Sequence, residues 1–184
     1  CHFDPDLYKR AVKRQKGWVG AFGQAGTAQG HLEKKGVCGG DLFLFFGWFK
    51  QTDWGKENKK LQYVGKDWHV ISGYLEVGKV VQMKGNCESN KRLDGHPHYL
   101  AQLCKDAHDG NLNKCKEDCK LPGKNTIYLA SDTLTFNRNL PGYGTFKFND
   151  KLRLTGDGMT RSRWNLDRDI FKGTKISYHP NPWK

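Results

Sequence analysis

The chain has 184 residues, the size of one globular domain with room for a hydrophobic core. Aromatic residues make up 12% of it, which argues against a disordered chain, because disordered chains lack the large apolar side chains that fill a core. Lys and Arg outnumber Asp and Glu to give a formal net charge of +12. We therefore expect a polyanionic partner, nucleic acid ahead of an anionic membrane, unless the charge serves solubility alone.

The chain carries no membrane-spanning or secretory segment that the sequence reveals. Its longest apolar run, residues 42–49, is too short to cross a bilayer. The six cysteines could form disulfides in a secreted protein, but a domain of this size needs no covalent cross-links. We expect reduced thiols, a cytoplasmic protein and no association with membranes.

Residues 4–16 carry the signature of an α-helix. Asp4 suits the N-cap and Pro5 the first helical position, and apolar side chains follow at helical spacing. The opposite face would carry a basic stripe that either binds phosphate or is simply solvated. This stripe contains Lys9, Arg10, Lys13, Arg14 and Lys16, of which the three lysines are the candidate phosphate ligands.

A second helix is predicted over residues 22–36, ended by Gly36. The glycines at its start could expose backbone amides to an anion. Gln24 and Gln29 could read the edge of a base, and His31 could help to orient it. Tight helix packing explains the same small residues without any ligand.

After residue 36 the spacing of the hydrophobic residues changes from a helical to a strand pattern. Residues 42–49 are apolar on both faces and predict a buried central strand, followed by a lysine-rich loop over residues 50–67. A second strand is predicted over residues 69–83, with bends at Gly73 and Gly78.

Three shorter elements and an extended tail complete the pattern. We expect a short helix over residues 99–107, strands over 125–130 and 152–154, and an extended tail from 161 to 184. Helices first and then mostly strands predict an α+β fold, in which N-terminal helices pack on a curved mixed or antiparallel sheet.

Two groups of residues could perform acid–base chemistry. His2, Asp4 and Asp6 place an imidazole and two carboxylates within five residues, where they could act as acid, base or nucleophile, or hold a metal. Helix capping by Asp4 and a dipole contact of Asp6 are the structural alternative. His96 and His98 flank a proline and form a second acid–base or metal element, unless they only complete hydrogen bonds.

A third group has the composition of a structural zinc site. Four soft ligands fall within sixteen residues: Cys104, His108, Cys115 and Cys119. The common C-x-x-C spacing is absent, so free thiols or disulfides are the alternatives. If zinc binds, four protein ligands leave no open position for catalysis.

Aromatic and basic residues also alternate in two parts of the chain. Rings could stack on unpaired bases while the cations hold phosphates, and core packing is the alternative for some of them. The residues are Trp48, Phe49, Lys50, Trp54, Arg161, Arg163, Trp164, Trp183 and Lys184.

Several segments together resemble the third of the "nucleotide modification associated" domain families. They are HFDPDL (2–7), AFGQAGTAQGHL (21–32), GDLFLFFGWF (40–49), HVISGYLEVG (69–78), HPH (96–98), NTIYLA (125–130), and the closing RSRWNL and SYH. The resemblance covers most of the chain. It implies a single domain over residues 1–184, with a polar, cysteine-rich insertion at about 100–124. It also implies an upstream N-terminal segment that this chain lacks.

This resemblance implies an enzyme, or an enzyme component, that modifies a nucleobase in DNA or a nucleotide. Asp4 and Asp6 would then act as acid, base or nucleophile, with His2 or His98 as the proton carrier. The remaining roles follow: Gln24, Gln29 and His31 would orient the base, the lysine stripe would hold phosphate, and Trp48 and Arg161 would bind substrate.

A looser likeness links GGDLFLFF and YLEVGKVV to PUA-like barrels, which bind modified or flipped bases. It implies a barrel form of the sheet. It also implies an alternative function, a non-catalytic module that binds modified nucleic acid. A nuclease or toxin of a defence system is a third class, and RNA stays open beside DNA and nucleotides.

Overall fold

The structure is a computed structural model. It describes residues 4–11, 13–55, 59–83, 93, 95–107, 124–161, 163–166 and 172. The chain divides into two compact units: unit 1 contains Cys1–Phe45 and Ser72–Lys147, and unit 2 contains Phe46–Ile71 and Phe148–Lys184.

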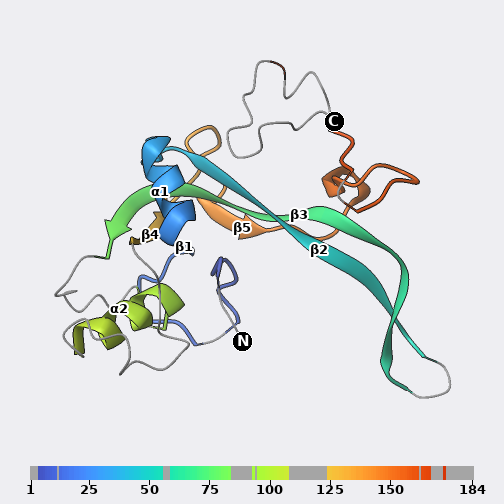
Figure 1. Cartoon of the computed structure of the whole chain (residues 1–184), viewed down its shortest axis with the longest axis horizontal. Coiled ribbons are helices and arrows are strands. Elements are labelled where there is room, and N and C mark those ends of the chain that lie inside the picture. The colour runs from blue at the N-terminus through green and yellow to red at the C-terminus, as the bar shows by residue number, and fades with distance from the viewer. Residues whose placement is uncertain are drawn as a thin grey trace. The chain divides into compact units, whose positions relative to one another are not determined.

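The principal element is a five-stranded sheet. Its strands are β1 (Ala21–Ala25), β2 (Leu42–Trp54), β3 (Leu61–Gln82), β4 (Asn125–Ala130) and β5 (Tyr143–Thr145). They follow the order β1-β4-β3-β2, and β5 pairs with β3 (Figure 1). The registers of β1 with β4, β4 with β3, and β3 with β5 are all antiparallel. The described strands form an open sheet, and with two α-helices the fold is of the α+β type.

Strand β4 lies at the centre of unit 1 and is buried along its whole length. Because side chains alternate across a strand, Ile127 and Leu129 face one side and Tyr128 and Ala130 the other. Helices α1 (Gly26–Lys34) and α2 (Pro97–Ala107) lie on opposite sides of β1 and β4 (Figure 1). Unit 1 therefore has a helix on each face of its sheet.

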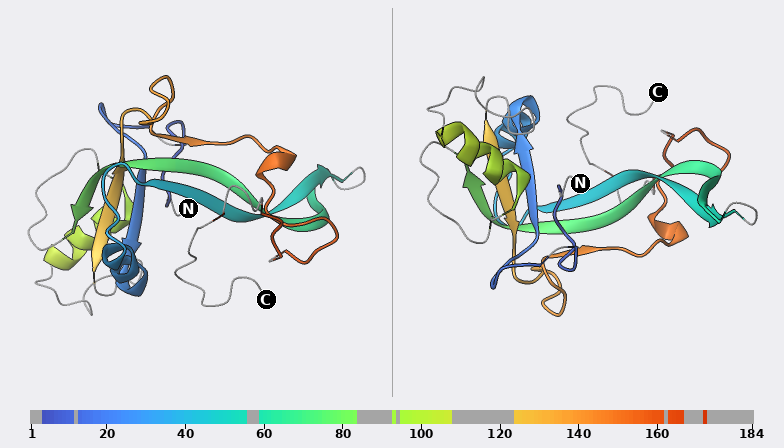
Figure 2. Two further views of the ribbon diagram at one scale, coloured as in Figure 1. Left: turned by 90° about the horizontal axis from the view of Figure 1, so that it is seen from above. Right: turned by 90° about the horizontal axis from the view of Figure 1, so that it is seen from below.

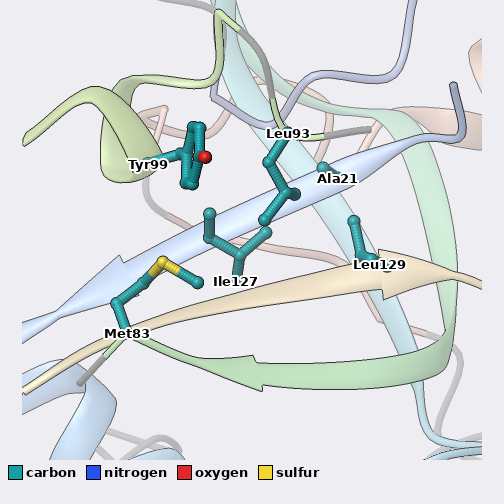
Figure 3. Close-up of a cluster of buried hydrophobic side chains, with 6 residues drawn as sticks. All are labelled: Ala21, Met83, Leu93, Tyr99, Ile127 and Leu129. Carbon is teal, nitrogen blue, oxygen red and sulfur yellow. The ribbon is translucent and has the colours of Figure 1, made fainter. Parts of the chain in front are cut away.

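Two hydrophobic clusters fill the two faces. The cluster beneath α2 is drawn in Figure 3 and contains Ala21, Met83, Leu93, Tyr99, Ile127 and Leu129. Tyr99 reaches it from α2, whereas Ile127 and Leu129 reach it from β4 (Figure 3). The cluster on the other face has Leu7, Leu75, Val77, Tyr128 and Ala130 at its centre, and Leu32 of α1 packs against it.

The predicted bend at Gly78 is confirmed as an irregularity in the pairing of β3 with β4. The register shifts between Val77 and Lys79, as a β-bulge requires. A Cβ at Gly78 would lie 2.7 Å from the backbone of Ser131, so only glycine fits there. Because of the extra residue, Leu75 and Val77 on one side of the bulge and Val80 on the other side all point to the same hydrophobic cluster.

The helix predicted for residues 4–16 is wrong. Residues 4–11 and 13–16 contain no helix, because their polar groups have tertiary partners instead. The backbone of Asp6 pairs with Ala21 of β1, with N···O distances of 2.7 and 2.9 Å. A local capping pattern was therefore overridden by pairing to a strand edge.

The predicted helix 22–36 is only partly correct. Its first residues belong to β1, whose register with β4 runs from Ala21 opposite Leu129 to Ala25 opposite Asn125. The helix itself begins at Gly26, and its C-terminal end by Gly36 is confirmed, with φ of +71° at this glycine.

Strand β2 was predicted to be central and short, and both expectations are wrong. It ends the strand order, and it continues to Trp54. The lysine-rich residues around 50–67 are consequently not a loop: β2 and β3 extend into them and run side by side (Figure 2). Apolar side chains on both faces thus marked an exposed edge strand, not a buried one.

The remaining elements divide into confirmed and incorrect ones. Helix α2 and strand β4 cover the predicted residues, and β3 covers all but the last residue of its prediction. The strand expected at 152–154 is only partly correct: Asp150–Leu152 form the short 3₁₀ helix η2, and Arg153 forms an isolated antiparallel bridge with Val70 of β3. The insertion boundaries stay a prediction. Most of the tail after 166 lies outside the described residues.

None of the helices in the described part of the chain is long and apolar enough to span a membrane.

Candidate functional site

The site is built on the free edge of β1, where the N-terminal segment runs alongside. The backbone pairing of Asp6 with Ala21 aligns this segment with the strand. Two residues further along β1, the amide of Gly23 donates to Oδ1 of Asp4 at 2.8 Å. The Asp4 carboxylate thus takes the place of a backbone partner, and its position is fixed by the sheet.

The start of α2 brings two histidines to the same place. The carbonyl of His96 accepts from the amides of Tyr99 and Leu100, as expected for the residue that precedes a helix. Pro97 occupies the first helical position, where its missing N–H costs nothing. His96 Nδ1 accepts from the amide of His98 at 3.3 Å, so the remaining proton of a neutral His96 ring is on Nε2.

Asp4, His98 and Asn125 meet at the centre of the site. His98 Nε2 lies 3.2 Å from Oδ2 of Asp4, and His98 Nδ1 lies 2.7 Å from Oδ1 of Asn125. The amide nitrogen of Asn125 donates to the carbonyl of His98 at 2.9 Å, which turns its oxygen toward the ring. Both ring nitrogens of His98 therefore face oxygen acceptors, and the imidazolium form can donate to both.

The charge of His98 follows from this geometry. Burial opposes protonation, but the hydrogen bonds to Asp4 and Asn125 and the charge of Asp4 outweigh it and raise the pKa of His98 above its ordinary value. The side chains of Asp4 and His98 are only 9% and 8% exposed, so solvent screens their attraction little. His96 Nε2 lies farther away, 3.9 Å from Oδ1 of Asp4.

Gly23 leaves the space that this arrangement requires. A Cβ on Gly23 would lie 2.2 Å from Cδ2 of His98, closer than two carbon atoms can approach. The imidazole therefore lies directly over the backbone of β1. Gly23 is one of the glycines expected to offer an amide to an anion, and its amide donates to the Asp4 carboxylate, whereas Asn125 was not predicted. A polar Asn at the start of the predicted strand 125–130 was the available signal for Asn125.

Asp6, the other predicted carboxylate, is engaged elsewhere. Both of its oxygens accept from the Arg14 guanidinium, at 2.7 and 2.5 Å. The same guanidinium lies 4.2 Å over the Trp18 ring. This bidentate, nearly buried pair favours a structural role for Asp6. His2 lies outside the described residues.

The predicted base-reading residues do not converge on Asp4 through any contact that the structure shows. Gln24 Oε1 accepts from the neighbouring amide of Ala25. Gln29 is buried, and its Oε1 accepts from the Tyr128 hydroxyl at 3.0 Å. His31 is half-buried in α1. The lysines predicted to bind phosphate, Lys9, Lys13 and Lys16, are exposed but do not share a helix face.

Two predicted binding residues meet in unit 2. The Arg161 guanidinium lies 3.8 Å from the centre of the Trp48 ring, within the range of a cation–π contact. Trp48 lies on β2 and remains largely exposed.

The predicted zinc site cannot be followed as a group. Cys104 is a half-buried free thiol of α2, whereas His108, Cys115 and Cys119 lie outside the described residues. Among the residues that are described, no cluster of three or more His, Cys, Asp or Glu side chains is arranged to hold a metal ion.

These observations define an α+β protein with a carboxylate–imidazole pair held between a strand edge and a helix start. The chain belongs to the nucleotide modification associated domain 3 family, whose family model matches residues 1–184. The resemblance inferred from the sequence is thereby confirmed, and the family associates the chain with nucleotide modification. No curated protein and no solved structure shows significant similarity to it.

Proposed function

We propose that this protein is an enzyme, or an enzyme component, that modifies a nucleobase in DNA or in a nucleotide. One observation carries the proposal. Asp4, His98 and Asn125 come from three separate segments and meet at 3.2 and 2.7 Å in an almost buried position. Buried carboxylate–imidazole pairs with a shifted pKa are typical of acid–base sites.

Asp4 is the group that meets the substrate, as a base or as a nucleophile. The amide of Gly23 and the ring of His98 each bind one of its oxygens, so the carboxylate is oriented without any movement of the chain. His98 and Asn125 act as positioning residues. His98 also holds a proton that can pass to Asp4 and back, because its Nε2 lies directly against Oδ2. Nucleobase chemistry uses such transfers at ring nitrogens and exocyclic groups.

The reaction requires access to the base, and within a duplex the base must be flipped out of the stack. A polyanionic substrate agrees with the formal net charge of +12. This proposal implies a cytoplasmic protein with access to nucleotides or DNA.

The second candidate is a PUA-like reader module without chemistry of its own. The exposed aromatic side chains of unit 2, Trp48 and Trp54 among them, are the observation that favours it. A reader would bind one base form and leave its substrate unchanged. A nuclease or toxin, the third class, would instead cut the strand.

Nucleoside analysis separates these candidates. DNA and free nucleotides from cells that express the wild-type protein, Asp4→Asn or no protein are digested and compared by mass spectrometry. Asn keeps an oxygen that can accept from Gly23 but has no acid–base function. Asp157→Asn, a change at an exposed carboxylate of unit 2, is the matched control.

A nucleoside mass that appears or disappears with the wild type and Asp157→Asn, but not with Asp4→Asn, is the expected result. Identical profiles with and without the wild-type protein would contradict the enzyme proposal and favour the reader. Fragmented DNA would favour the nuclease.

A further inference from the structure

Strands β2 and β3 carry an aromatic face within unit 2. Side chains of a strand alternate, so Phe46, Trp48 and Trp54 of β2 point to the same side, and Lys50 lies between them. Phe49 points to the opposite side. Phe46, Trp48 and Trp54 therefore share one face of β2, whereas Phe49 lies on the other face.

Two contacts show which residues of β3 share this face. Lys50 forms an ion pair with Asp67 at 3.3 Å, and the Phe46 ring lies 5.4 Å from the His69 ring. Asp67 and His69 therefore lie on the side of Phe46 and Lys50. Tyr63 belongs to the side of Trp54: the amide of Gly55 donates to the carbonyl of Lys60 at 2.9 Å, so Trp54 lies opposite Leu61, and Tyr63 follows Leu61 by two residues.

A third segment completes the face. The Trp164 ring packs edge-on against Phe46 at 4.8 Å, and its indole nitrogen donates to His69 Nδ1 at 2.9 Å. These contacts hold Phe46 in place. We call the set Phe46, Trp48, Trp54, Tyr63 and Trp164 the aromatic face.

The outer part of the aromatic face is open to solvent. Trp48, Trp54 and Tyr63 are 62%, 64% and 76% exposed. Exposed aromatic side chains that gather on one face mark a binding surface more often than singly scattered ones do. Trp48 to Trp54 spans about 20 Å at about 3.3 Å per residue, the length of about six base steps at 3.4 Å.

The charge on this face identifies the class of ligand. Arg161 lies 3.8 Å from the centre of the Trp48 ring and has the charge available for phosphate, while Lys50, which shares its charge with Asp67, lies between Trp48 and Trp54 on the strand. Basic residues outnumber acidic ones in unit 2 as they do in the whole chain. Rings that alternate with cations bind unpaired bases by stacking, while the cations hold the phosphates. A protein partner would need no such alternation.

We infer that the aromatic face binds single-stranded DNA, so that the substrate of the proposed enzyme is a base in a DNA strand rather than a free nucleotide. The choice of DNA rests on the proposed function. The stacking surface itself rests on the geometry of unit 2.

Fluorescence anisotropy of the full chain with a fluorescein-labelled 15-nucleotide DNA of mixed sequence tests the inference. The same sequence as a duplex and as RNA, and unlabelled dTMP as competitor, are the comparisons. We expect the single-stranded DNA to bind most tightly, and millimolar dTMP to compete poorly because it offers one base only.

Trp54→Ala and Tyr63→Ala are the informative variants, because both rings are exposed and their removal leaves the core intact. Each should weaken binding about 5-fold to 100-fold, the range for loss of one base stack. Phe49→Ala is the matched control: it removes an exposed ring of the same strand from the opposite face and should change binding less than 2-fold. Circular dichroism checks that each variant keeps its strands.

Three results would overturn the inference. They are undetectable binding of the single strand at 50 mM salt, equal losses for Phe49→Ala and Trp54→Ala, and tighter binding of duplex, RNA or dTMP. A dimer that Trp54→Ala dissociates, without DNA binding, would assign the face to a second copy of the chain. The two proposals can fail separately. Wild-type protein that binds the single strand but leaves all nucleosides unchanged would refute the proposed enzyme alone, whereas nucleoside modification without single-strand binding would refute this inference alone.

Discussion

At the scale of single residues, the pKa values of His98 and His69 should be shifted in opposite directions. Hydrogen bonds and the Asp4 charge outweigh burial at His98 and raise its pKa, whereas burial and Arg161 lower the pKa of His69. NMR of the imidazole protons over pH 5 to 9, with His98→Gln and His69→Gln for assignment, should place His98 above about 6.5 and His69 below it. The reverse order would contradict the geometry described for both rings.

The same shift links stability to pH. A pKa that is raised in the folded state stabilises the protein fully below the unfolded value of about 6.5, and this contribution is lost as the pH rises through the folded pKa. The difference in unfolding free energy between the wild type and His98→Gln should therefore be larger at pH 5.5 than at pH 9. Urea denaturation at both values measures it. A difference that grows with pH would show that His98 is neutral in the folded state.

Two glycines in neighbouring elements offer a matched comparison. Gly23→Ala places a methyl group where His98 Cδ2 lies 2.2 Å away, so the ring or strand must move, at a cost of about 1–3 kcal/mol. Gly30→Ala meets no atom within 4 Å and should stabilise α1 by about 0.5–1 kcal/mol. Thermal unfolding of the two variants should change in opposite directions. Equal effects would mean that His98 does not lie over Gly23.

At the residue scale, the sequence could predict Asp4 and His98 as candidates but not their relation. Nothing in the spacing of residues so far apart shows that they touch. Their contact depends on the pairing of residues 4–6 with β1 and on the start of α2. Asn125 was missed because its only local signal was a polar residue at a strand end.

At the scale of elements, the buried carboxylate of Glu76 should be important for the connection after β4. Its Oε1 accepts from the Ser131 hydroxyl at 3.1 Å, and its Oε2 accepts from the amide and hydroxyl of Thr135 at 2.9 and 3.0 Å. Glu76→Gln replaces an acceptor by a donor, so we expect a loss of about 1.5–3 kcal/mol. Urea denaturation measures it, with Asp157→Asn as an exposed control. A loss below about 0.5 kcal/mol would contradict this role.

The errors at this scale share one cause. Residues 4–16 have good capping and helical spacing, and residues 42–49 are apolar on both faces, so local rules predicted a helix and a central strand. Both predictions failed because strand pairing outside the segment decided the outcome: the first segment pairs with β1, and the second pairs with β3 at the end of the sheet. Elements whose burial matched their pattern, such as β4 and α2, were predicted correctly.

At the scale of the whole molecule, the charge of +12 should control binding to DNA. A protein that neutralises several phosphates releases counterions, so affinity falls steeply with salt. We expect binding to the 15-nucleotide strand to weaken at least about 10-fold between 50 and 200 mM NaCl, and Trp54→Ala to keep the same salt slope. A salt-independent affinity would contradict a phosphate-binding surface.

The central claim is that Asp4 and His98 act together on a nucleobase. The most direct test compares modified nucleosides by mass spectrometry for the wild type, Asp4→Asn, His98→Gln and the double variant, at equal amounts of folded protein. Residues that act as one unit have non-additive effects. The account therefore predicts that each single variant loses most of the product and that the double variant loses no more. Undiminished product from either single variant would contradict it.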